Sequence, residues 1–300
     1  MVICVIDGLG KNVRQRQCKD IMPCFCKWSV ADTCCQVLAM GTMPDEVFLP
    51  YGVMVRIPRI YQPAPLVSDR EIELDAQATA HVTRVLRLKA GDALRVFDGE
   101  GGEYEAVISN VGRRVATIEI GDFVDRSVES PLELVLVQGI SRGERMDYTV
   151  QKAVELGVTR IIPVMTERTV VNLKGERKEK RREHWQSVVN SACEQCGRNT
   201  IPQVAPVITF HDWLGEPNEG YKLVLHHRAQ NTLPERPPQQ GSITLLIGPE
   251  GGLSFVEISA AQSAGYLPLR LGPRVMRTET AAVAALSVLQ WTWGDFGGDQ

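Results

Sequence analysis

Two glycine-rich bends in the C-terminal part of the chain have the residue types of a small-molecule site. Residues 248–252 read GPEGG and residues 271–273 read LGP, and each bend directly follows a short apolar run. Glycine lets the backbone approach a ligand closely and adopt positive φ, and proline fixes the chain around it. Apolar runs of this kind are typical of buried parallel strands, whose carboxyl ends bind ligands in open α/β sheets. The bends therefore predict a small molecule held by backbone groups.

The same bends lack the two common phosphate-binding patterns. Neither is followed by Gly-Lys-Ser or Gly-Lys-Thr, so no P-loop is predicted, and the glycine spacing is not Gly-x-Gly-x-x-Gly. A dinucleotide-binding enzyme is therefore disfavoured. Spacing alone does not separate a ligand loop from a turn that only serves packing, and on this ground both interpretations stay open.

The elements that must position the bends alternate between strand and helix. Apolar runs predict strands at residues 132–138, 160–164, 222–226, 244–247 and 267–271. Helical spacing and glycine stops predict helices at residues 145–156, 176–196, 254–264 and 278–290. Ser254 and Glu257 fit a capping box at the start of the third helix. This alternation predicts an α/β domain with a parallel sheet and right-handed crossovers.

The first half of the chain is rich in strand patterns. Residues 78–88 have helical spacing, and three runs of alternating apolar and polar residues follow, separated by turns at 99–102 and 112–114. This pattern predicts a small antiparallel meander or barrel. A polar stretch at 123–131 marks the predicted boundary between a domain at 54–124 and a domain at 131–292. Residues 1–53 show no sustained period, and we expect a disordered extension or a mis-assigned start, with translation beginning at Met54.

Composition limits the function classes. The chain has 300 residues, 44% of them apolar, which is enough for two hydrophobic cores. Its net charge of −3 does not indicate a general nucleic-acid binder, so any RNA contact must come from local basic patches. No apolar run is long enough to span a bilayer, and we expect no membrane partner and a cytoplasmic location.

The cysteines predict neither disulfides nor a metal site. Six of the eight precede Met54, and no secretory signal accompanies them. Cys193 and Cys196 have the spacing of half a zinc site, but no second ligand pair has suitable spacing. We therefore expect free thiols and no metal.

Four motifs, in order, resemble one family. They are RIPRIY at 56–61, ERMDYTVQKAVELGV at 144–158, EQxGR at 194–198, and GPEGG at 248–252 followed by LGxRxxRTETA at 271–281. These motifs are similar to those of the RsmE family, which comprises bacterial 16S ribosomal RNA uridine-N3 methyltransferases of the SPOUT class that use S-adenosylmethionine. The resemblance covers residues 54 to 290. Met276 and Val275 stand where the family usually has leucine and isoleucine.

The resemblance implies a fold and an activity. The expected fold is a PUA-like RNA-binding β-barrel followed by a SPOUT α/β domain whose C-terminal segment forms a trefoil knot around the methyl donor. The expected reaction is methyl transfer from S-adenosylmethionine to N3 of a specific uridine in 16S ribosomal RNA, within the small subunit or its assembly intermediate. The family works as a homodimer, and the helix at 278–290 is expected at the dimer face. A non-catalytic RNA-binding protein on the same scaffold is the alternative.

The resemblance also assigns a set of residues to the methyl donor. All of them lie in or beside the two bends. They are Leu246, Ile247, Gly248, Pro249, Gly251, Gly252, Leu271, Gly272, Met276, Thr278 and Ala281.

Three charged residues are the catalytic candidates. Methylation of uridine N3 removes a proton from a weakly acidic imide, so a base or an electrostatic stabiliser must lie nearby. Arg277 would stabilise negative charge on the uracil oxygens, and Glu279 or Glu250 would orient the base or the sulfonium. Spacing does not decide which carboxylate acts. Alternatively, Glu279 only caps a helix, since acids near a helix N-terminus favour its dipole.

RNA contacts are expected at basic and amide side chains in both domains. The alternative is that these residues belong to ordinary salt-bridged surface helices. Arg168, Gln195 and Arg198 could hydrogen-bond the edge of a flipped uracil, and the others could hold phosphates. The set is Arg56, Arg59, Arg84, Arg87, Arg142, Arg145, Lys152, Arg168, Gln195 and Arg198.

Overall fold

The computed structural model describes residues 46–48, 54–63, 65–112, 114–171, 173–234 and 241–297. The described residues fall into two units, the first ending at Arg56 and the second beginning at Ile57. In the first unit, β1 (Glu46–Phe48) pairs antiparallel with β2 (Met54–Arg56). The expectation for residues 1–53 otherwise lies outside the described residues, as does the side chain of Arg56.

The second unit begins with a five-stranded sheet. In spatial order its strands are β3 (Arg59–Tyr61), β5 (Ala93–Phe97), β6 (Glu103–Val111), β7 (Ala116–Val124) and β4 (Arg70–Glu73). The strands β5, β6 and β7 form the antiparallel meander that the alternating sequence predicts, and β3 joins β5 in parallel. Ile60, Val96 and Ile118 are fully buried in the core of this sheet.

The helical segment that packs on this sheet differs from the expected single helix at 78–88. It consists of α2 (Ala76–Ala80), followed directly by the π-helical segment η1 (His81–Leu86). The Asp75 carboxylate caps α2 by accepting a hydrogen bond from the Ala78 amide at 2.7 Å. Arg87, with φ at 55°, ends the segment. The spacing of apolar residues does not distinguish a π-helical turn from an α-helical turn here, because Val82 faces the core in either case.

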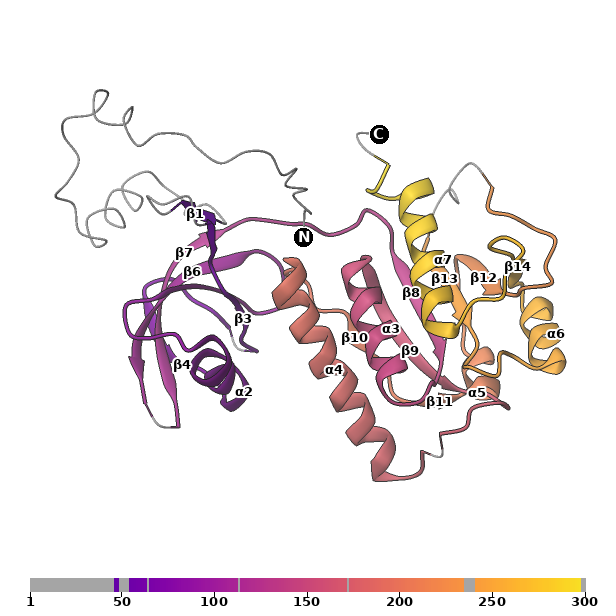
Figure 1. Ribbon diagram of the computed structural model, residues 1–300, viewed down its shortest axis with the longest axis horizontal. Coiled ribbons are helices and arrows are strands. Elements are labelled where there is room, and N and C mark those ends of the chain that lie inside the picture. Colours follow the sequence, from indigo (N-terminus) through magenta and orange to yellow (C-terminus); the bar gives the residue numbers. More distant parts are fainter. Residues whose placement is uncertain are drawn as a thin grey trace, which may run out of the picture. The chain divides into compact units, whose positions relative to one another are not determined.

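The remainder of the second unit is built on a seven-stranded sheet. Its path runs β10 (Gln203–Val204), β9 (Val158–Met165), β8 (Leu134–Gly139), β13 (Ile243–Ile247), β12 (Tyr221–Leu225) and β14 (Leu267–Leu269), and β11 (Ile208–Thr209) also pairs with β9. Every pairing is parallel, which confirms the predicted sheet. Figure 1 shows β8 and β13 side by side in this sheet.

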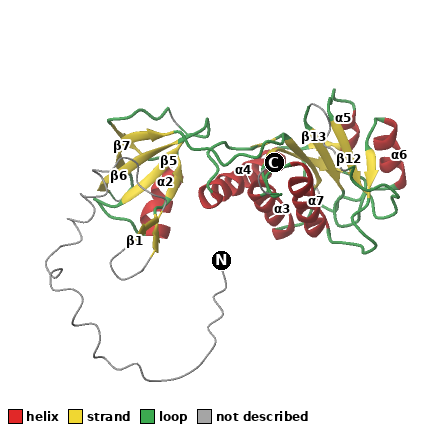
Figure 2. Ribbon diagram, turned by 90° about the horizontal axis from the view of Figure 1, so that it is seen from above, coloured by secondary structure: helices red, strands yellow, loops and turns green. Residues whose placement is uncertain are grey.

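Helices cover both faces of the parallel sheet. One face packs against α3 (Glu144–Glu155), α4 (Glu176–Cys196) and α7 (Thr278–Trp293), and the other against α5 (Phe210–Leu214) and α6 (Phe255–Ser263). Figure 2 shows the two groups of helices. The predicted capping box of Ser254 and Glu257 is present at the start of α6. Within the described part of the chain, no helix is long and apolar enough to cross a membrane.

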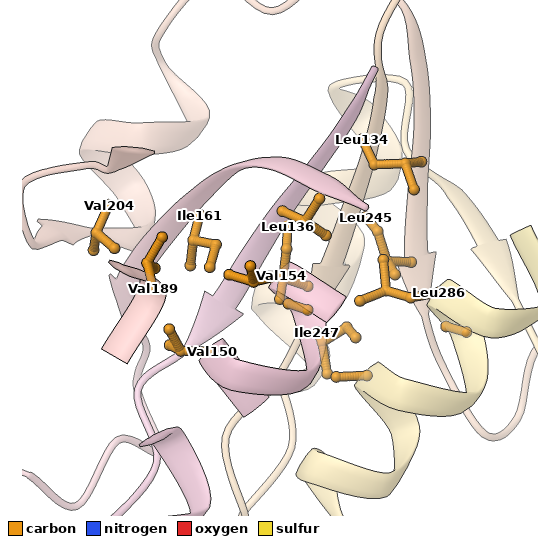
Figure 3. Packing of buried hydrophobic residues seen from close by; sticks show 14 of the residues in the cluster. Leu134, Leu136, Val150, Val154, Ile161, Val189, Val204, Leu245, Ile247 and Leu286 are labelled. Carbon is orange, nitrogen blue, oxygen red and sulfur yellow. The ribbon is translucent and has the colours of Figure 1, made fainter. Parts of the chain in front are cut away.

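The larger core fixes the strands that carry the glycine-rich bends. Figure 3 shows Leu136 of β8 and Leu245 of β13 close to Val154 of α3 and Leu286 of α7. Full burial of a side chain of this size contributes roughly 1.5–3 kcal/mol. The register pairs Gln138 with Ile247 and Leu225 with Leu269, so the carboxyl ends of β8, β13, β12 and β14 lie next to one another. The loops that leave these strands therefore meet.

Candidate functional site

The two glycine-rich bends form opposite walls of one pocket at this edge of the sheet. The pocket has a volume of about 260 Å³. It is lined by residues 247–253 after β13, residues 269–276 after β14, the end of β12, and the first turns of α7. Ligand pockets in open α/β sheets lie at the carboxyl ends of the strands, as this one does.

All but one of the residues expected to hold the methyl donor line this pocket. The exception is Leu246, which packs into the core under α5 and α6 and is fully buried. Successive strand residues point to opposite faces of a sheet, so Ile247 reaches the pocket and Leu246 turns away from it. The Leu246 side chain therefore does not contribute to the pocket lining, and a contact of its backbone with the donor stays a prediction. The residues that do line the pocket are Ile247, Gly248, Pro249, Gly251, Gly252, Leu271, Gly272, Met276, Thr278 and Ala281.

The backbone of the first bend is too tightly folded for side chains at two positions. A Cβ on Gly248 would lie 2.7 Å from the Leu253 nitrogen, and a Cβ on Gly139 would lie 2.5 Å from the Pro249 nitrogen. Contacts this short with backbone atoms force the backbone to move. The bend thus depends on glycine both within itself and in the strand behind it.

A buried glutamine fastens this bend to the start of α7. The Gln138 amide Nε2 donates to Thr278 Oγ1 at 3.0 Å and to the Gly248 carbonyl at 3.4 Å. The Thr278 hydroxyl in turn donates to the same Gly248 carbonyl at 2.7 Å. Gln138 was not among the residues expected from the sequence. The available signal was a lone polar residue at the end of the apolar run LELVLVQG.

Replacing Thr278 by valine is expected to weaken donor binding about tenfold, because Gln138 Nε2 and the Gly248 carbonyl each lose one hydrogen bond. Valine keeps the shape of threonine but cannot bond Gly248 or Gln138. Calorimetric titration of the variant with the methyl donor measures the change. Thr280→Val, on an exposed position of the same helix, serves as the matched control. Equal affinity in both variants would show that the clamp has no role in binding.

The Glu250 side chain holds the first bend against the start of α3. Its carboxylate accepts a hydrogen bond from the Arg142 amide at 2.8 Å and lies 3.4 Å from Arg145 Nη1. Burial alone would raise the pKa of Glu250, but the Arg142 amide and the Arg145 guanidinium outweigh it and hold the pKa below its usual value. Glu250 is therefore ionised at neutral pH and is a weak proton acceptor.

The Glu250 contact gives a defined pH dependence of stability. A carboxyl group whose folded pKa is depressed stabilises the fold above its ordinary pKa of 4.5, and this contribution is lost as the pH falls through the folded value. We expect Glu250→Gln to lower the thermal midpoint at neutral pH. The difference from the unmodified protein should shrink once the pH is well below 4.5. Melting curves recorded from neutral pH to well below pH 4.5 test this expectation, with Glu216→Gln at an exposed position as control. A difference in thermal midpoint that does not change with pH would contradict the role given to the Glu250 carboxylate.

The other two catalytic candidates flank Thr278 at the margin of the pocket. Arg277 is exposed at the N-cap of α7, and its side chain makes no hydrogen bond or ion pair with the described residues. Glu279 lies in the first turn of α7, and its Oε2 is shielded from solvent without a hydrogen-bond partner in the described structure. A free guanidinium and a free carboxylate oxygen thus stand beside the donor pocket.

Several basic side chains around the pocket were not expected. Arg270, Arg274, His226 and His227 all line it. Burial, together with neighbouring His227 and Arg228, lowers the pKa of His226 below its usual value. Arg168, expected to contact RNA, also lines the pocket, and its Nη1 donates to the Gly251 carbonyl at 3.0 Å.

Two arginines expected to contact RNA are buried and serve the protein interior instead. Arg59 is 6% exposed and Arg198 is 4% exposed. Both guanidinium groups bond protein acceptors, among them Glu103 for Arg59 and Glu129 for Arg198. A buried guanidinium with its donors engaged has none left for a ligand, so this structure fits neither a phosphate contact by Arg59 nor a uracil-edge contact by Arg198.

The remaining candidates stay accessible to different degrees. Arg84 and Arg87 are exposed at the end of η1, and Gln195 is exposed near the end of α4. The Arg145 side chain is 46% exposed despite its contact with Glu250. Lys152 is engaged, since its Nζ lies 2.7 Å from Glu155 on the same helix.

The C-terminal cysteine pair lacks the surroundings of a metal or redox site. Burial raises the pKa of the Cys193 thiol to about 12, and burial likewise raises the pKa of Cys196. Both are free thiols. Among the described residues, no three His, Cys, Asp or Glu side chains are grouped so as to hold a metal ion.

The chain matches two family models. Residues 128–290 match the RNA methyltransferase domain, and residues 74–121 match the RNA methyltransferase PUA domain. A curated relative, the ribosomal RNA small subunit methyltransferase E of Buchnera aphidicola, is 37% identical over 241 residues, which cover 80% of this chain and 98% of the relative.

Two solved structures are similar over the same region. One is a ribosomal RNA small subunit methyltransferase E from Neisseria gonorrhoeae bound to S-adenosyl methionine, 41% identical with a TM-score of 0.77 over 80% of this chain and all of the other. The second is a Legionella pneumophila protein described as a methyltransferase in complex with the cofactor SAM. It is 42% identical with a TM-score of 0.77, over 81% of this chain and all of that protein.

Proposed function

Because the chain belongs to the ribosomal RNA small subunit methyltransferase E family, we propose that it methylates N3 of a uridine in 16S ribosomal RNA with S-adenosylmethionine as the methyl donor. The observation that carries the proposal is the pocket between the bends at 248–252 and 271–273. The residues suit such a donor: Ile247, Leu271 and Met276 offer apolar surface for an adenine ring, and the two bends bring backbone groups to the pocket. Basic and acidic side chains in the same lining can bond the polar ends of the donor.

The residues of this chain divide the work of the reaction. The bound donor supplies a methyl group that its sulfonium has already activated. Gln138 and Thr278 hold the first bend in place through the Gly248 carbonyl. Arg277, free at the pocket margin, faces the developing charge on the uracil oxygens once the N3 proton leaves. A preorganised cation stabilises that charge more in a site sheltered from water than in bulk solvent.

We propose Glu279 rather than Glu250 as the carboxylate that accepts or orients the N3 proton. Glu250 is engaged by Arg142 and Arg145, which keep it ionised. One carboxylate oxygen of each residue lacks a partner in the described structure. Glu250 is nevertheless tied down through its other oxygen, whereas Glu279 makes no ion pair with the described residues and lies one residue from the pocket wall at Thr278. The sequence left this choice open, and the hydrogen bonds of Glu250 favour Glu279.

The two domains have separate tasks in this proposal. Residues 54–124 grip ribosomal RNA through exposed cations such as Arg84 and Arg87, and residues 131–292 bind the donor and the target base. Phosphate contacts of this kind position an RNA without reading its sequence. The chain acts as a homodimer in the cytoplasm, where its ribosomal substrate is found. Val288 and Trp291 on α7 are exposed apolar residues of the kind that a dimer would cover.

Methylation in vitro tests the proposed function. Small ribosomal subunits from cells that lack the gene are incubated with the purified protein and labelled donor, and the 16S ribosomal RNA is digested for mass spectrometry. We expect one N3-methyluridine per RNA. A methyl group on another atom overturns the proposed target. Donor binding without transfer, or no donor binding, favours a non-catalytic RNA-binding protein on the same scaffold.

A further inference from the structure

A buried carboxylate in the five-stranded sheet is surrounded by arginines. Glu103 of β6 is fully buried. Its Oε2 accepts a hydrogen bond from Arg59 Nε at 3.0 Å, its Oε1 accepts one from Arg95 Nη1 at 2.7 Å, and Arg126 Nη1 lies 3.6 Å from Oε1. Arg59 is therefore one of several arginines that contact Glu103.

The Nη1 and Nη2 groups of Arg59 donate hydrogen bonds to residues of the parallel-sheet domain. Nη1 donates to the Cys193 carbonyl at 3.2 Å, and Nη2 donates to the Arg198 carbonyl at 3.3 Å and to Asn199 Oδ1. The Cys193 carbonyl belongs to the last turn of α4, which ends at the left-handed Gly197. Carbonyls at a helix C-terminus carry partial negative charge, so a buried cation there is favourable. Arg59 thus caps α4 from the neighbouring sheet.

The residues that follow α4 extend this contact to the rest of the domain. Arg198 Nη1 donates to the carbonyls of Val154, at the end of α3, and Val158, at the start of β9. Asn199 Nδ2 donates to the carbonyl of Arg126 in the segment that joins the two sheets. The start of α3 is in turn held by Glu250 of the donor bend. Helix α3 therefore connects the two places: Arg198, whose carbonyl Arg59 bonds, contacts its end, and Glu250 of the pocket contacts its start.

Two further contacts beside Arg59 also link the five-stranded sheet and its helical segment to α4. The Tyr61 amide, on edge strand β3, donates to Glu194 Oε1 of α4 at 3.0 Å, and His81 Nδ1 lies 3.2 Å from Glu194 Oε2. The Phe97 ring lies under the Arg59 guanidinium at 4.8 Å and packs into the core of the parallel-sheet domain. The contact between the five-stranded sheet and the parallel-sheet domain therefore includes directional bonds to α4 as well as apolar packing.

We propose that Arg59 is a positioning residue that fixes the RNA-gripping sheet relative to the methyl-donor pocket. This inference rests on the proposed function. Buried ion pairs contribute little net stability compared with apolar packing, and their directional bonds define one arrangement of the groups that they join. An arrangement fixed in this way lets one RNA contact both domains at once. Two linked contacts bind more tightly than either alone only when the geometry permits simultaneous engagement.

The test is a double-mutant cycle on Arg59→Gln and Asn199→Leu, with both kinetics and donor affinity measured on the full chain. We expect either single variant to raise the KM for ribosomal RNA by about tenfold, since one of two linked RNA contacts is impaired. The Kd for S-adenosylmethionine should stay unchanged. The double variant should have the same KM as the single variants, because Arg59 acts through the α4 end that Asn199 helps to form.

Three results would overturn the positioning role. Additive effects in the double variant indicate that Arg59 and Asn199 act independently and not through one shared contact. A parallel loss of donor affinity indicates general damage to the fold, which melting curves of each variant report. An unchanged KM in both single variants indicates that the contact has no part in RNA binding. Arg59→Lys is a further control. Lysine keeps the positive charge but lacks the planar guanidinium that bonds several acceptors at once, so this variant should raise the KM for RNA as Arg59→Gln does. Absence of methylation by the unmodified protein refutes the proposed function and is distinct from all three.

Discussion

Replacing Arg277 by alanine is expected to lower the rate of methyl transfer about 100-fold, the usual effect of removing one preorganised charge-stabilising group. Arg277 is exposed at the N-cap of α7 and contributes no side-chain hydrogen bond to the helix. Its loss therefore removes no side-chain hydrogen bond or ion pair among the described residues. The affinity for the donor should stay unchanged, because Arg277 does not line the pocket. Single-turnover methyl transfer and calorimetry measure the two quantities separately.

Arg160→Ala is the matched control for Arg277→Ala. Arg160 is also an exposed arginine, but it lies near the start of β9, at the edge of the sheet opposite to the pocket. Its replacement should leave the rate unchanged. A rate for Arg277→Ala equal to that of this control would remove Arg277 from the mechanism. An equal fall in rate and donor affinity would assign it to donor binding instead.

Replacing Gly248 by alanine is expected to lower catalytic efficiency about 100-fold, the cost of a displacement near 1 Å in a positioned group. The new Cβ would stand 2.7 Å from the Leu253 nitrogen and 2.8 Å from the Gly252 carbonyl carbon. Both atoms belong to the backbone, so the bend itself must open. The effect should arise mainly from weaker donor binding, which calorimetry detects.

Gly215→Ala provides the comparison for this substitution. Gly215 lies at the end of α5, outside the pocket, and a Cβ there would meet no atom closer than 3.4 Å. Donor affinity in that variant should match the unmodified protein. If Gly248→Ala binds the donor as tightly as Gly215→Ala, the close-packed bend is not part of the donor site.

The sequence predicts the fold where local patterns are long and uninterrupted. The helix expected at 176–196 is α4 with the same bounds, and the capping box at Ser254 and Glu257 is confirmed. The parallel sheet follows from the alternation of apolar runs with helices. The segment at 201–214 was not expected to contain β10, β11 and α5, because its apolar runs are short and interrupted by proline. The trefoil knot and the dimer stay predictions.

The two bends of the pocket are foreseeable because each is contiguous in sequence. Two bends, each following a strand of one parallel sheet, must meet at that sheet's carboxyl edge. The Leu246 side chain lies outside the pocket because the motif includes neighbouring residues regardless of the strand's alternation. Gln138 was missed because its partners, Gly248 and Thr278, lie more than one hundred positions away.

The roles of Arg59 and Arg198 are the clearest failure of local interpretation. An arginine in a short motif looks the same whether it faces RNA or the protein interior. Arg59 acquires its partners only when α4 packs beside β3, since Cys193 and Asn199 are distant in the chain. Burial, which decides between the two roles, depends on that long-range packing and not on the spacing of the motif.

A crystal structure of the protein soaked with S-adenosylmethionine would test the central claim most directly. The account predicts donor density between the two bends, with the adenosine against Ile247, Leu271 and Met276 and the sulfonium toward the start of α7. A donor bound elsewhere, or bends closed against each other at saturating donor concentration, would contradict it.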